Sequence, residues 1–333
     1  MLAETPVFIT GLYRSGTTLL SRALNAHPKL SITYDNVHFM RFCYKKFEPL
    51  NNKNVFNLLN DVSGRIFERS KIKLNTNLVI SELNKLEKIQ YSNIYNAIMK
   101  DCFLKNSNKL IWGEKTNVAW GAIPGFLKMF PKGKCIFLLR DPRDVLCSYK
   151  KMTTNPFPNY LDTIFASLGA FQQASYLTKK ISKDNLLILK YENFVTNPEK
   201  ILKDISSFIG ISYNKSMVDI NCYTDLTGNK WVSNTSYKES LKKISPDSIG
   251  RWNKNILDEE ICLLELLLKE EMVNYGYKLS QIKYSINSFI KSFEIIRNSP
   301  LLTDRFNLWL TEKRGVDTYP NNPSWQPVTV KSD

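Results

Sequence analysis

The sequence predicts an α/β fold in which a central parallel sheet is flanked by helices. The first observation is a set of short apolar runs with the length of buried strands, near residues 6–11, 109–113, 134–139 and 186–190. The second is a set of segments with helical character between and after them, near residues 17–26, 120–130, 142–152, 159–181, 198–209 and 257–272. Strands that alternate with helices are typical of a doubly wound parallel sheet, which binds ligands beyond the carboxyl ends of its strands.

The first predicted strand runs directly into a turn with the spacing of a phosphate-binding loop. Residues 11–18 read GLYRSGTT, so four residues separate Gly11 from Gly16. In a P-loop with this spacing, backbone N–H groups at a helix N-terminus hold an anion. Thr17 occupies the position at which a nucleoside triphosphatase has lysine, and the positive charge lies upstream on Arg14. The turn therefore predicts an anionic ligand other than a magnesium-bound nucleoside triphosphate.

A second motif, RDPRDVLCS, follows the third predicted strand and begins at Arg140. Asp141 is a favourable N-cap and Pro142 suits the first helical position, so a helix is expected to begin there. Arg140 then stands at the carboxyl end of a strand, and Ser148 lies about two turns along the helix. An arginine and a hydroxyl so placed could bind a phosphate through charge-assisted hydrogen bonds. The alternative is that Arg140 forms an ion pair with Asp141 or Asp144.

Together the two motifs resemble those of the sulfotransferases that use 3′-phosphoadenosine 5′-phosphosulfate (PAPS). The turn resembles their 5′-phosphosulfate loop, and the second motif resembles their 3′-phosphate motif. Similar segments follow in the family's order at residues 189–194, 197–199, 208–210, 234–236, 250–252 and 275–277. The first motif is most similar to tyrosylprotein sulfotransferases and their bacterial relatives. The resemblance implies a P-loop-type sulfotransferase fold with PAPS as donor and 3′-phosphoadenosine 5′-phosphate (PAP) as product.

The resemblance also implies which residues bind the donor. Three groups are expected: Arg14, Ser15, Gly16, Thr17 and Thr18 at its 5′ end, Arg140 and Ser148 at its 3′-phosphate, and Tyr191 and Ser236 at the nucleotide. No metal is required by this mechanism, and the sequence indicates none.

The expected catalytic base lies shortly after the first predicted helix. The nearer relatives have an acidic residue at the position that corresponds to Asp35 on an ungapped count from Arg14. In those relatives the residue is usually glutamate, and the residues around it differ from those around Asp35. A one-residue gap is therefore an alternative, and it brings Asn36 and His38 into register with a Glu-x-His pair of other sulfotransferases. Asp35 is preferred over His38, because an aspartate side chain ordinarily carries its charge at pH 7. Glu114 is a further alternative.

The chemistry explains why such residues are needed. Sulfuryl transfer is an in-line displacement, so by analogy with phosphoryl transfer it depends on positioning and on the neutralisation of charge. Arg14 is expected to neutralise the donor, and Asp35 to take the proton from the acceptor hydroxyl. Lys115 resembles a family lysine that approaches the donor and could offset charge on the bridging oxygen. The alternative is that Lys115 is a solvated lysine paired with Glu114.

Length and composition predict one large domain with extensions. The chain has 333 residues and 43% hydrophobic side chains, enough for a sizeable core. We expect a sulfotransferase domain at residues 1–279, in which residues 40–105 form a helical insertion that caps the acceptor site. Residues 280–333 are expected to form a helical extension and tail, for which contacts between two copies of the chain, in a homodimer, are one use.

The charge of the chain suits an anionic ligand. There are 46 lysines and arginines against 31 acidic residues, a formal net charge of +15. Nucleic acid is the obvious alternative partner of a basic chain. The sequence contains no zinc-ligand spacing, no basic arm and no strand that combines aromatic with basic residues, so nucleic-acid binding is not expected.

The cysteines and the N-terminus predict a cytoplasmic location. The six cysteines show no paired short spacing, which is typical of free thiols in a reducing compartment. The first expected strand begins near Pro6, which leaves no room for a signal peptide, and no apolar run reaches membrane-spanning length.

The sequence thus predicts a metal-independent PAPS sulfotransferase that acts on a hydroxyl acceptor. A carbohydrate or small-molecule hydroxyl is preferred, and peptidyl tyrosine stays open. One alternative is a P-loop kinase of a small molecule, which would require a lysine after Gly16 and a magnesium-binding acid. The residue after Gly16 is Thr17, so the lysine is absent. The other is a non-catalytic module that binds a nucleotide or a sulfated glycan.

Overall fold

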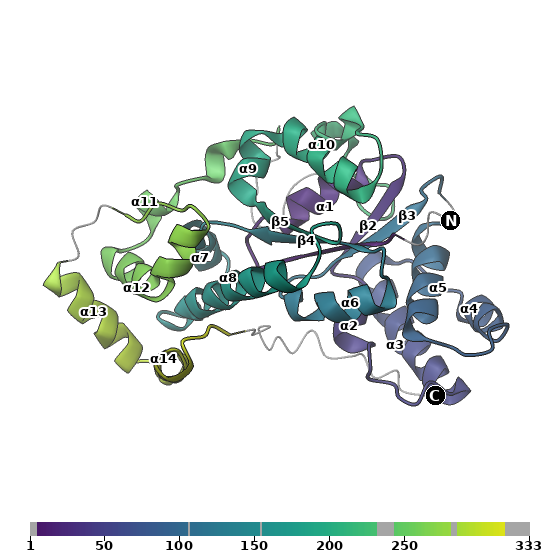
Figure 1. Ribbon diagram of the computed structural model, residues 1–333, viewed down its shortest axis with the longest axis horizontal. Coiled ribbons are helices and arrows are strands. Elements are labelled where there is room, and N and C mark those ends of the chain that lie inside the picture. The colour runs from purple at the N-terminus through teal and green to yellow at the C-terminus, as the bar shows by residue number, and fades with distance from the viewer. Residues whose placement is uncertain (1–4, 106, 154, 232–242, 281–284, 317–333) are drawn as a thin grey trace.

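A parallel five-stranded sheet forms the centre of the molecule (Figure 1). The structure is a computed structural model and describes residues 5–105, 107–153, 155–231, 243–280 and 285–316. The strand order is β2-β3-β1-β4-β5, and every pairing is parallel. The strands are β1 (Val7–Gly11), β2 (Leu30–Tyr34), β3 (Ile111–Lys115), β4 (Lys134–Leu139) and β5 (Leu186–Lys190). The predicted α/β fold with a central parallel sheet is therefore confirmed.

Strand β2 is the one strand of this sheet that the sequence analysis missed. Its sequence, LSITY, alternates apolar and polar residues, so it does not form a continuous apolar run. Ser31 and Thr33 are nevertheless buried together with Leu30 and Ile32, because helices cover both faces of the sheet. β2 pairs only with β3 and forms one edge of the sheet.

The predicted helices on the two faces of the sheet are present. They are α1 (Thr17–Asn25), α6 (Ile123–Met129), α7 (Pro142–Lys150), α8 (Asp162–Lys180), α10 (Pro198–Ile209) and α12 (Asp258–Asn274). Helix α7 begins as its sequence predicts, since the Asp141 carboxylate accepts the N–H of Arg143 at 2.9 Å and Pro142 is the first helical residue. A short helix that was not predicted, α9 (Tyr191–Thr196), follows β5 directly.

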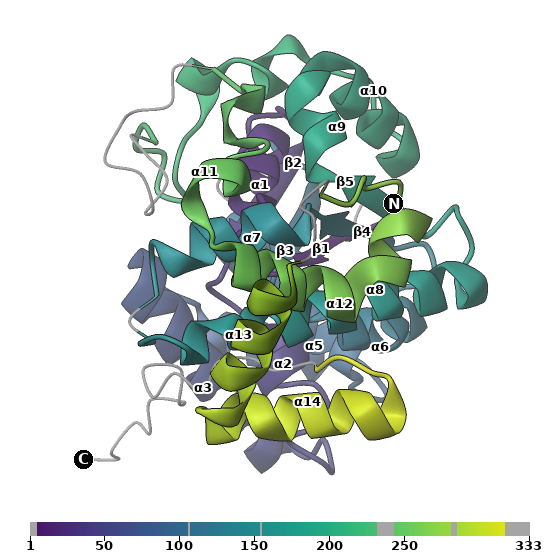
Figure 2. The same ribbon diagram turned by 90° about the vertical axis from the view of Figure 1, so that its left-hand side faces the viewer.

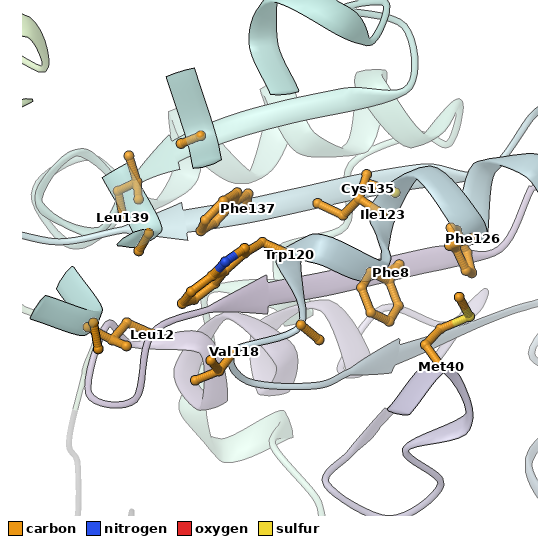
Figure 3. Packing of buried hydrophobic residues seen from close by; sticks show 14 of the residues in the cluster. Phe8, Leu12, Met40, Val118, Trp120, Ile123, Phe126, Cys135, Phe137 and Leu139 are labelled. Carbon is orange, nitrogen blue, oxygen red and sulfur yellow. The ribbon is translucent and has the colours of Figure 1, made fainter. Parts of the chain in front are cut away.

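Each face of the sheet has its own apolar core. Helices α1, α9 and α10 cover one face, whereas α6 and α8 lie against the other (Figure 1). On the second face Trp120 stacks on Phe137, with ring centroids 5.5 Å apart and an interplanar angle of 7° (Figure 3). Phe8 stacks on Phe126 at 5.1 Å. Full burial of one such side chain contributes about 1.5–3 kcal/mol, which fixes the strands that lead to the site.

The region between β2 and β3 is helical, as the sequence predicts. It contains α2 (Phe39–Phe42), α3 (Asn52–Ser70), α4 (Thr76–Leu83) and α5 (Tyr91–Phe103). Helix α3 buries one side, with Val55, Leu58, Leu59, Val62 and Ile66 in the core. The boundaries assigned to this insertion, and its role as an acceptor cap, stay predictions.

The C-terminal part packs against α8. After α11 (Trp252–Asn255), helix α12 contacts α8, and α13 (Ile286–Arg297) and α14 (Pro300–Glu312) follow it (Figure 2). Beyond α14 the chain returns to α8, where the Val316 N–H donates to the Phe165 carbonyl at 3.1 Å. The extension therefore contributes two helices and an anchored segment, and its use in dimer contacts stays a prediction.

All six cysteines lie in the described residues and are free thiols, as expected. Four are buried, namely Cys43, Cys135, Cys147 and Cys262. Within the described ranges, no helix combines the length and the apolar character needed to cross a membrane. The cytoplasmic location stays a prediction.

Candidate functional site

The two predicted donor-binding motifs meet at the carboxyl ends of neighbouring strands. β1 and β4 pair in register, with Gly11 opposite Leu138, and each strand leads into one motif. Arg14 Nε donates to Ser148 Oγ at 2.9 Å. Arg140 Nη1 donates to the Arg14 carbonyl at 2.8 Å. The sheet therefore brings Arg14 into contact with two residues that lie more than 120 positions later in the chain.

The turn after β1 depends on glycine at position 16. Gly16 has a φ of 97°, in the left-handed region that favours glycine. A Cβ atom there would also lie 2.3 Å from the Tyr191 ring, so only glycine fits. Gly16 is the N-cap of α1, and no side chain caps this helix. Its first-turn N–H groups are therefore suited to an anionic ligand.

The hydroxyls of Ser15 and Thr17 hold the turn itself. Ser15 Oγ donates to the Leu12 carbonyl at 2.6 Å, and Thr17 Oγ1 donates to Asn117 Oδ1 at 2.8 Å. Both residues are buried, whereas Thr18 lines a pocket described below. Contacts of these residues with the donor stay predictions.

Arg140 spans the gap between the turn and a later part of the chain. Its Nη2 donates to the Ser248 carbonyl at 2.8 Å, and its guanidinium lies 4.5 Å from the centre of the Tyr191 ring. Arg140 is 8% exposed, and its Nε is buried with no hydrogen-bond partner among the described residues. A buried, incompletely satisfied guanidinium is suited to a phosphate, so the residues present fit the predicted 3′-phosphate.

The alternative ion pairs of Arg140 are not formed. The Asp141 carboxylate pairs with Arg143, whose Nη2 lies 2.6 Å from Asp141 Oδ2. The Asp144 carboxylate accepts the N–H groups of Gly250 at 2.8 Å and Trp252 at 3.1 Å. Both carboxylates are therefore engaged elsewhere.

Tyr191 joins the two donor-binding motifs. Its ring lies against Gly16 and beneath Arg140, and its hydroxyl lies 2.7 Å from Ser248 Oγ. The adjacent Glu192 accepts the Asp141 N–H at 2.8 Å, and burial raises its pKa. Contact of Tyr191 with the nucleotide stays a prediction. Ser236, the other residue expected to contact the nucleotide, lies outside the described residues.

The predicted base and the predicted lysine form an ion pair. β2 and β3 end side by side, and Lys115 Nζ contacts Asp35 Oδ2 just beyond the end of β2. The Lys115 side chain is 1% exposed and that of Asp35 is 27% exposed. The alternative in which Lys115 pairs with Glu114 is not formed, because neighbouring side chains on a strand point to opposite faces.

Glu114 is held in a closed network on the other face of β3. Its carboxylate accepts hydrogen bonds from the Tyr95 hydroxyl, the His38 backbone N–H and the Thr116 hydroxyl, the last at 3.0 Å. Glu114 is fully buried, and burial raises its pKa. The network fixes the chain three residues after Asp35.

His38, the alternative base, is fully buried, and the choice between it and Asp35 stays a prediction. Burial, with the nearby positive charge of Arg41 as the next cause, holds the pKa of His38 well below its usual range. Its ring packs edge-on against Phe42 at 5.8 Å. Asp35 and Asn36 line the adjacent pocket, whereas His38 does not.

A pocket of about 510 Å³ opens beside Asp35, and we call it the Asp35 pocket. Four parts of the chain line it: α1, the end of β2, the end of α3 and residues 225–231. Arg22, Arg69 and Trp231 are lining residues that the sequence analysis missed. Arg22 lies one turn after Thr18 on α1, so the helical spacing could have predicted that both residues line the same site. No sequence motif around Arg69 or Trp231 indicates that they belong to this pocket.

No cluster of three or more metal-ligating side chains occurs in the part of the chain that the structure describes. The expectation that no metal takes part stays a prediction.

Comparison with known proteins identifies the family. The family model of the sulfotransferase family matches residues 6–215. This range includes both motifs, Asp35 and Lys115. The chain belongs to the sulfotransferase family. The match confirms the resemblance seen in the sequence.

Relatives include protein-tyrosine sulfotransferases at low identity. Protein-tyrosine sulfotransferase 1 from Danio rerio is 24% identical over 252 residues, which cover 74% of this chain and 65% of the relative. The protein-tyrosine sulfotransferase from Drosophila melanogaster is 22% identical over 261 residues, covering 74% of this chain and 46% of the relative. The aligned part of the chain thus spans about half to two thirds of these proteins.

A solved structure shares the fold. The sulfotransferase domain from the Synechococcus PCC 7002 olefin synthase matches with a TM-score of 0.58 and 19% identity, covering 83% of this chain and 96% of that domain. This likeness confirms the sulfotransferase fold.

Proposed function

We propose that this sulfotransferase transfers a sulfuryl group from PAPS to a hydroxyl acceptor bound in the Asp35 pocket. Family membership supports sulfotransferase chemistry. The identity of the donor is supported by the residues that converge at the carboxyl ends of β1 and β4.

One observation carries the proposal. Arg14 and Arg140, each placed by its own motif, meet at the open N-terminus of α1, where Arg14 Nε donates to Ser148 at 2.9 Å and Arg140 donates to the Arg14 carbonyl at 2.8 Å. Both motifs thus bring a cationic side chain to one site, and like charges gathered in one site favour an anionic ligand. A donor with anionic groups at both its 5′ end and its 3′ position matches that arrangement.

The residues divide the work of the reaction. The first-turn N–H groups of α1, together with Arg14, hold the 5′ end of the donor, and Arg140 with Ser148 holds the 3′-phosphate. The donor supplies the sulfuryl group and leaves as PAP. Asp35 faces the pocket and accepts the proton of the acceptor hydroxyl. Lys115, now paired with Asp35, supplies positive charge near the reacting groups.

The acceptor is proposed to be a compact hydroxyl compound. A pocket of about 510 Å³ is in the size range of small-molecule sites. A carbohydrate or another small molecule is therefore preferred. The tyrosine sulfotransferases among the relatives make a peptidyl tyrosine the competing acceptor, and it is tested in the same assay.

Calorimetric binding of PAP and of adenosine 5′-phosphate tests the donor, because the two nucleotides differ only by the 3′-phosphate. We expect PAP to bind at least about 10-fold more tightly, since a charge-assisted hydrogen bond contributes about 1.5–3 kcal/mol. Arg140→Ala is expected to abolish the difference.

A matched control is Arg297→Ala, at the end of α13 and away from both motifs, which should leave the difference intact. Equal affinity of the wild-type protein for the two nucleotides would overturn the proposal. Labelled PAPS with panels of phenols, sugars and tyrosine peptides then identifies the acceptor.

A further inference from the structure

Arg22 is a buried cation on the wall of the Asp35 pocket. It lies on α1 and is 5% exposed. Its Nη1 donates to the Thr224 carbonyl, and its guanidinium carbon lies 3.8 Å from the centre of the Tyr34 ring and 5.7 Å from that of Trp231. Its Nε is buried and has no hydrogen-bond partner in the described residues. The guanidinium is therefore packed between aromatic walls with part of its hydrogen-bonding capacity unused.

Arg22 has no carboxylate partner among the residues that the structure describes. Asp225 also lines the pocket, but its Oδ1 accepts the N–H groups of Thr227 and Asn229, each at 2.9 Å. Burial lowers the pKa of Arg22, although an arginine stays charged in proteins. A buried cation that forms no ion pair with a carboxylate among the described residues is costly, even with the Thr224 carbonyl and the Tyr34 ring beside it, so this position is suited to an anionic ligand.

The charged residues that line the pocket also favour an anionic ligand. Arg22, Arg69 and Lys71 bring three cations to the lining, against the carboxylates of Asp35 and Asp225. The first carboxylate is already paired with a lysine and the second is occupied within its turn. Three cations against two carboxylates give the lining a net positive charge, which a neutral alcohol would not offset.

We infer that Arg22 binds a carboxylate carried by the acceptor, so that the acceptor is a compact hydroxy acid whose hydroxyl reacts at Asp35. The inference rests on the proposed function and adds the acceptor's chemical class to it. Arg22 makes and breaks no covalent bond in this role. It determines specificity, because a charge-assisted hydrogen bond distinguishes a carboxylate from an uncharged group of the same shape.

Matched acceptors that differ only in this charge test the inference. Transfer from radiolabelled PAPS is measured to 4-hydroxyphenylacetate and its primary amide, and to glucuronate and glucuronamide. For at least one pair, kcat/KM of the wild-type protein is expected to be about 10- to 100-fold higher with the carboxylate. Arg22→Gln should remove this preference, and Arg22→Lys, which keeps the charge, should retain part of it.

Arg314→Gln is the matched control, because Arg314 is an exposed arginine just beyond α14 that forms an ion pair with the exposed Glu312. It should keep the full preference. PAP affinity of every variant is measured alongside. A purely structural role of Arg22 predicts that Arg22→Gln slows both members of a pair equally, and that result overturns the inference.

The inference and the proposed function fail in different ways. If the wild-type protein binds PAP but prefers the amides, or transfers to neither carboxylate, the assignment of Arg22 is overturned and the donor assignment stands. If the wild-type protein does not bind PAP, the proposed function itself is overturned. Should Arg22→Gln fail to fold, Arg22→Lys decides: an unchanged ratio between carboxylate and amide contradicts the inference, and a reduced ratio supports it.

Discussion

The proposed donor side and the proposed acceptor side of the site are held in different ways. On the donor side, a turn after the central strand β1 meets a motif after its neighbour β4, and Gly16 lets Tyr191 pack on the turn. On the acceptor side, Asp35 follows the edge strand β2 with a φ of 53° and is held by an ion pair with Lys115. The first side depends on a backbone conformation and a spacing that only glycine allows, whereas the second depends on an ion pair between two side chains. Substitutions can separate the two.

Asp35→Asn is expected to give the largest separation. Loss of the proposed base should lower kcat by about 10²- to 10⁴-fold, the range of a general acid or base. PAP affinity should stay within about 2-fold of wild type, because the substitution leaves the proposed donor-binding residues unchanged. A twofold change corresponds to only about 0.4 kcal/mol. Initial rates with labelled PAPS and calorimetry with PAP measure the two quantities.

Asp225→Asn is the matched control, because it removes the other carboxylate of the same pocket. Its carboxylate accepts hydrogen bonds within its own turn, so kcat should change little. A wild-type rate for Asp35→Asn would remove Asp35 from the mechanism and return the choice of base to His38 and Glu114.

Gly16→Ala is expected to damage the donor side alone. The added Cβ meets the Tyr191 ring at 2.3 Å and takes a left-handed φ, so PAP affinity should fall by more than about 10-fold. The control is Gly64→Ala in α3, where the new Cβ meets no other part of the protein within 4 Å beyond the nearby backbone of its own helix, and the helix should gain about 0.5–1 kcal/mol. Unchanged PAP affinity in Gly16→Ala would mean that the donor binds elsewhere.

The same contrast explains what the sequence could predict. The donor motifs are contiguous, so Arg14, Gly16, Arg140 and Ser148 could be identified from spacing and resemblance, and the structure brings them together. The start of α7 could be predicted because Asp141 and the proline that follows it form a local signal.

The acceptor side was harder to predict because its signals are not local. β2 was missed because its alternating polar residues hide a strand that is buried on both faces. Arg22, Arg69 and Trp231 converge on the pocket from three separate parts of the chain, and no short pattern connects them. Lys115 was expected near the donor, but its pairing with Asp35 depends on β2 and β3 lying side by side.

Glu114→Gln tests whether the hydrogen bonds of the buried Glu114 carboxylate hold the segment that follows Asp35 in place. The amide cannot accept all three hydrogen bonds of the buried carboxylate, so the free energy of unfolding should fall by about 1–3 kcal/mol. Turnover should fall while PAP affinity is retained, because the network holds the segment that follows Asp35. Glu199→Gln, an exposed glutamate paired with Lys203, is the control and should change stability by less than about 0.5 kcal/mol. An equal loss in PAP affinity would show that the two sides are not separable.

The last expected effect is the response of the folding stability to acid. The chain has two histidines, and burial lowers the pKa of both His27 and His38 in the folded state. Below about pH 6.5 the unfolded chain therefore binds protons that the folded chain does not. Stability should fall as the pH decreases from 7.5 to 5.5, with a slope of at most about 1.4 kcal/mol per pH unit for each histidine.

His38→Asn should reduce this slope by up to about 1.4 kcal/mol per pH unit, the contribution of one proton, because asparagine does not titrate. Asparagine also tolerates the left-handed φ of 50° at this position. Urea unfolding of both proteins at pH 7.5 and 5.5 measures the difference. Identical slopes would show that His38 is protonated in the folded state.

The position of β2 at the margin of the sheet has an evolutionary consequence. A strand with one neighbour can be lengthened, shifted or replaced with less disturbance than a strand with neighbours on both sides, and Asp35 is attached to such a strand. The predicted phosphate-binding turn is attached to the strand in the middle. Divergence at the edge of the sheet can therefore change the Asp35 pocket while the turn that follows β1 keeps its geometry.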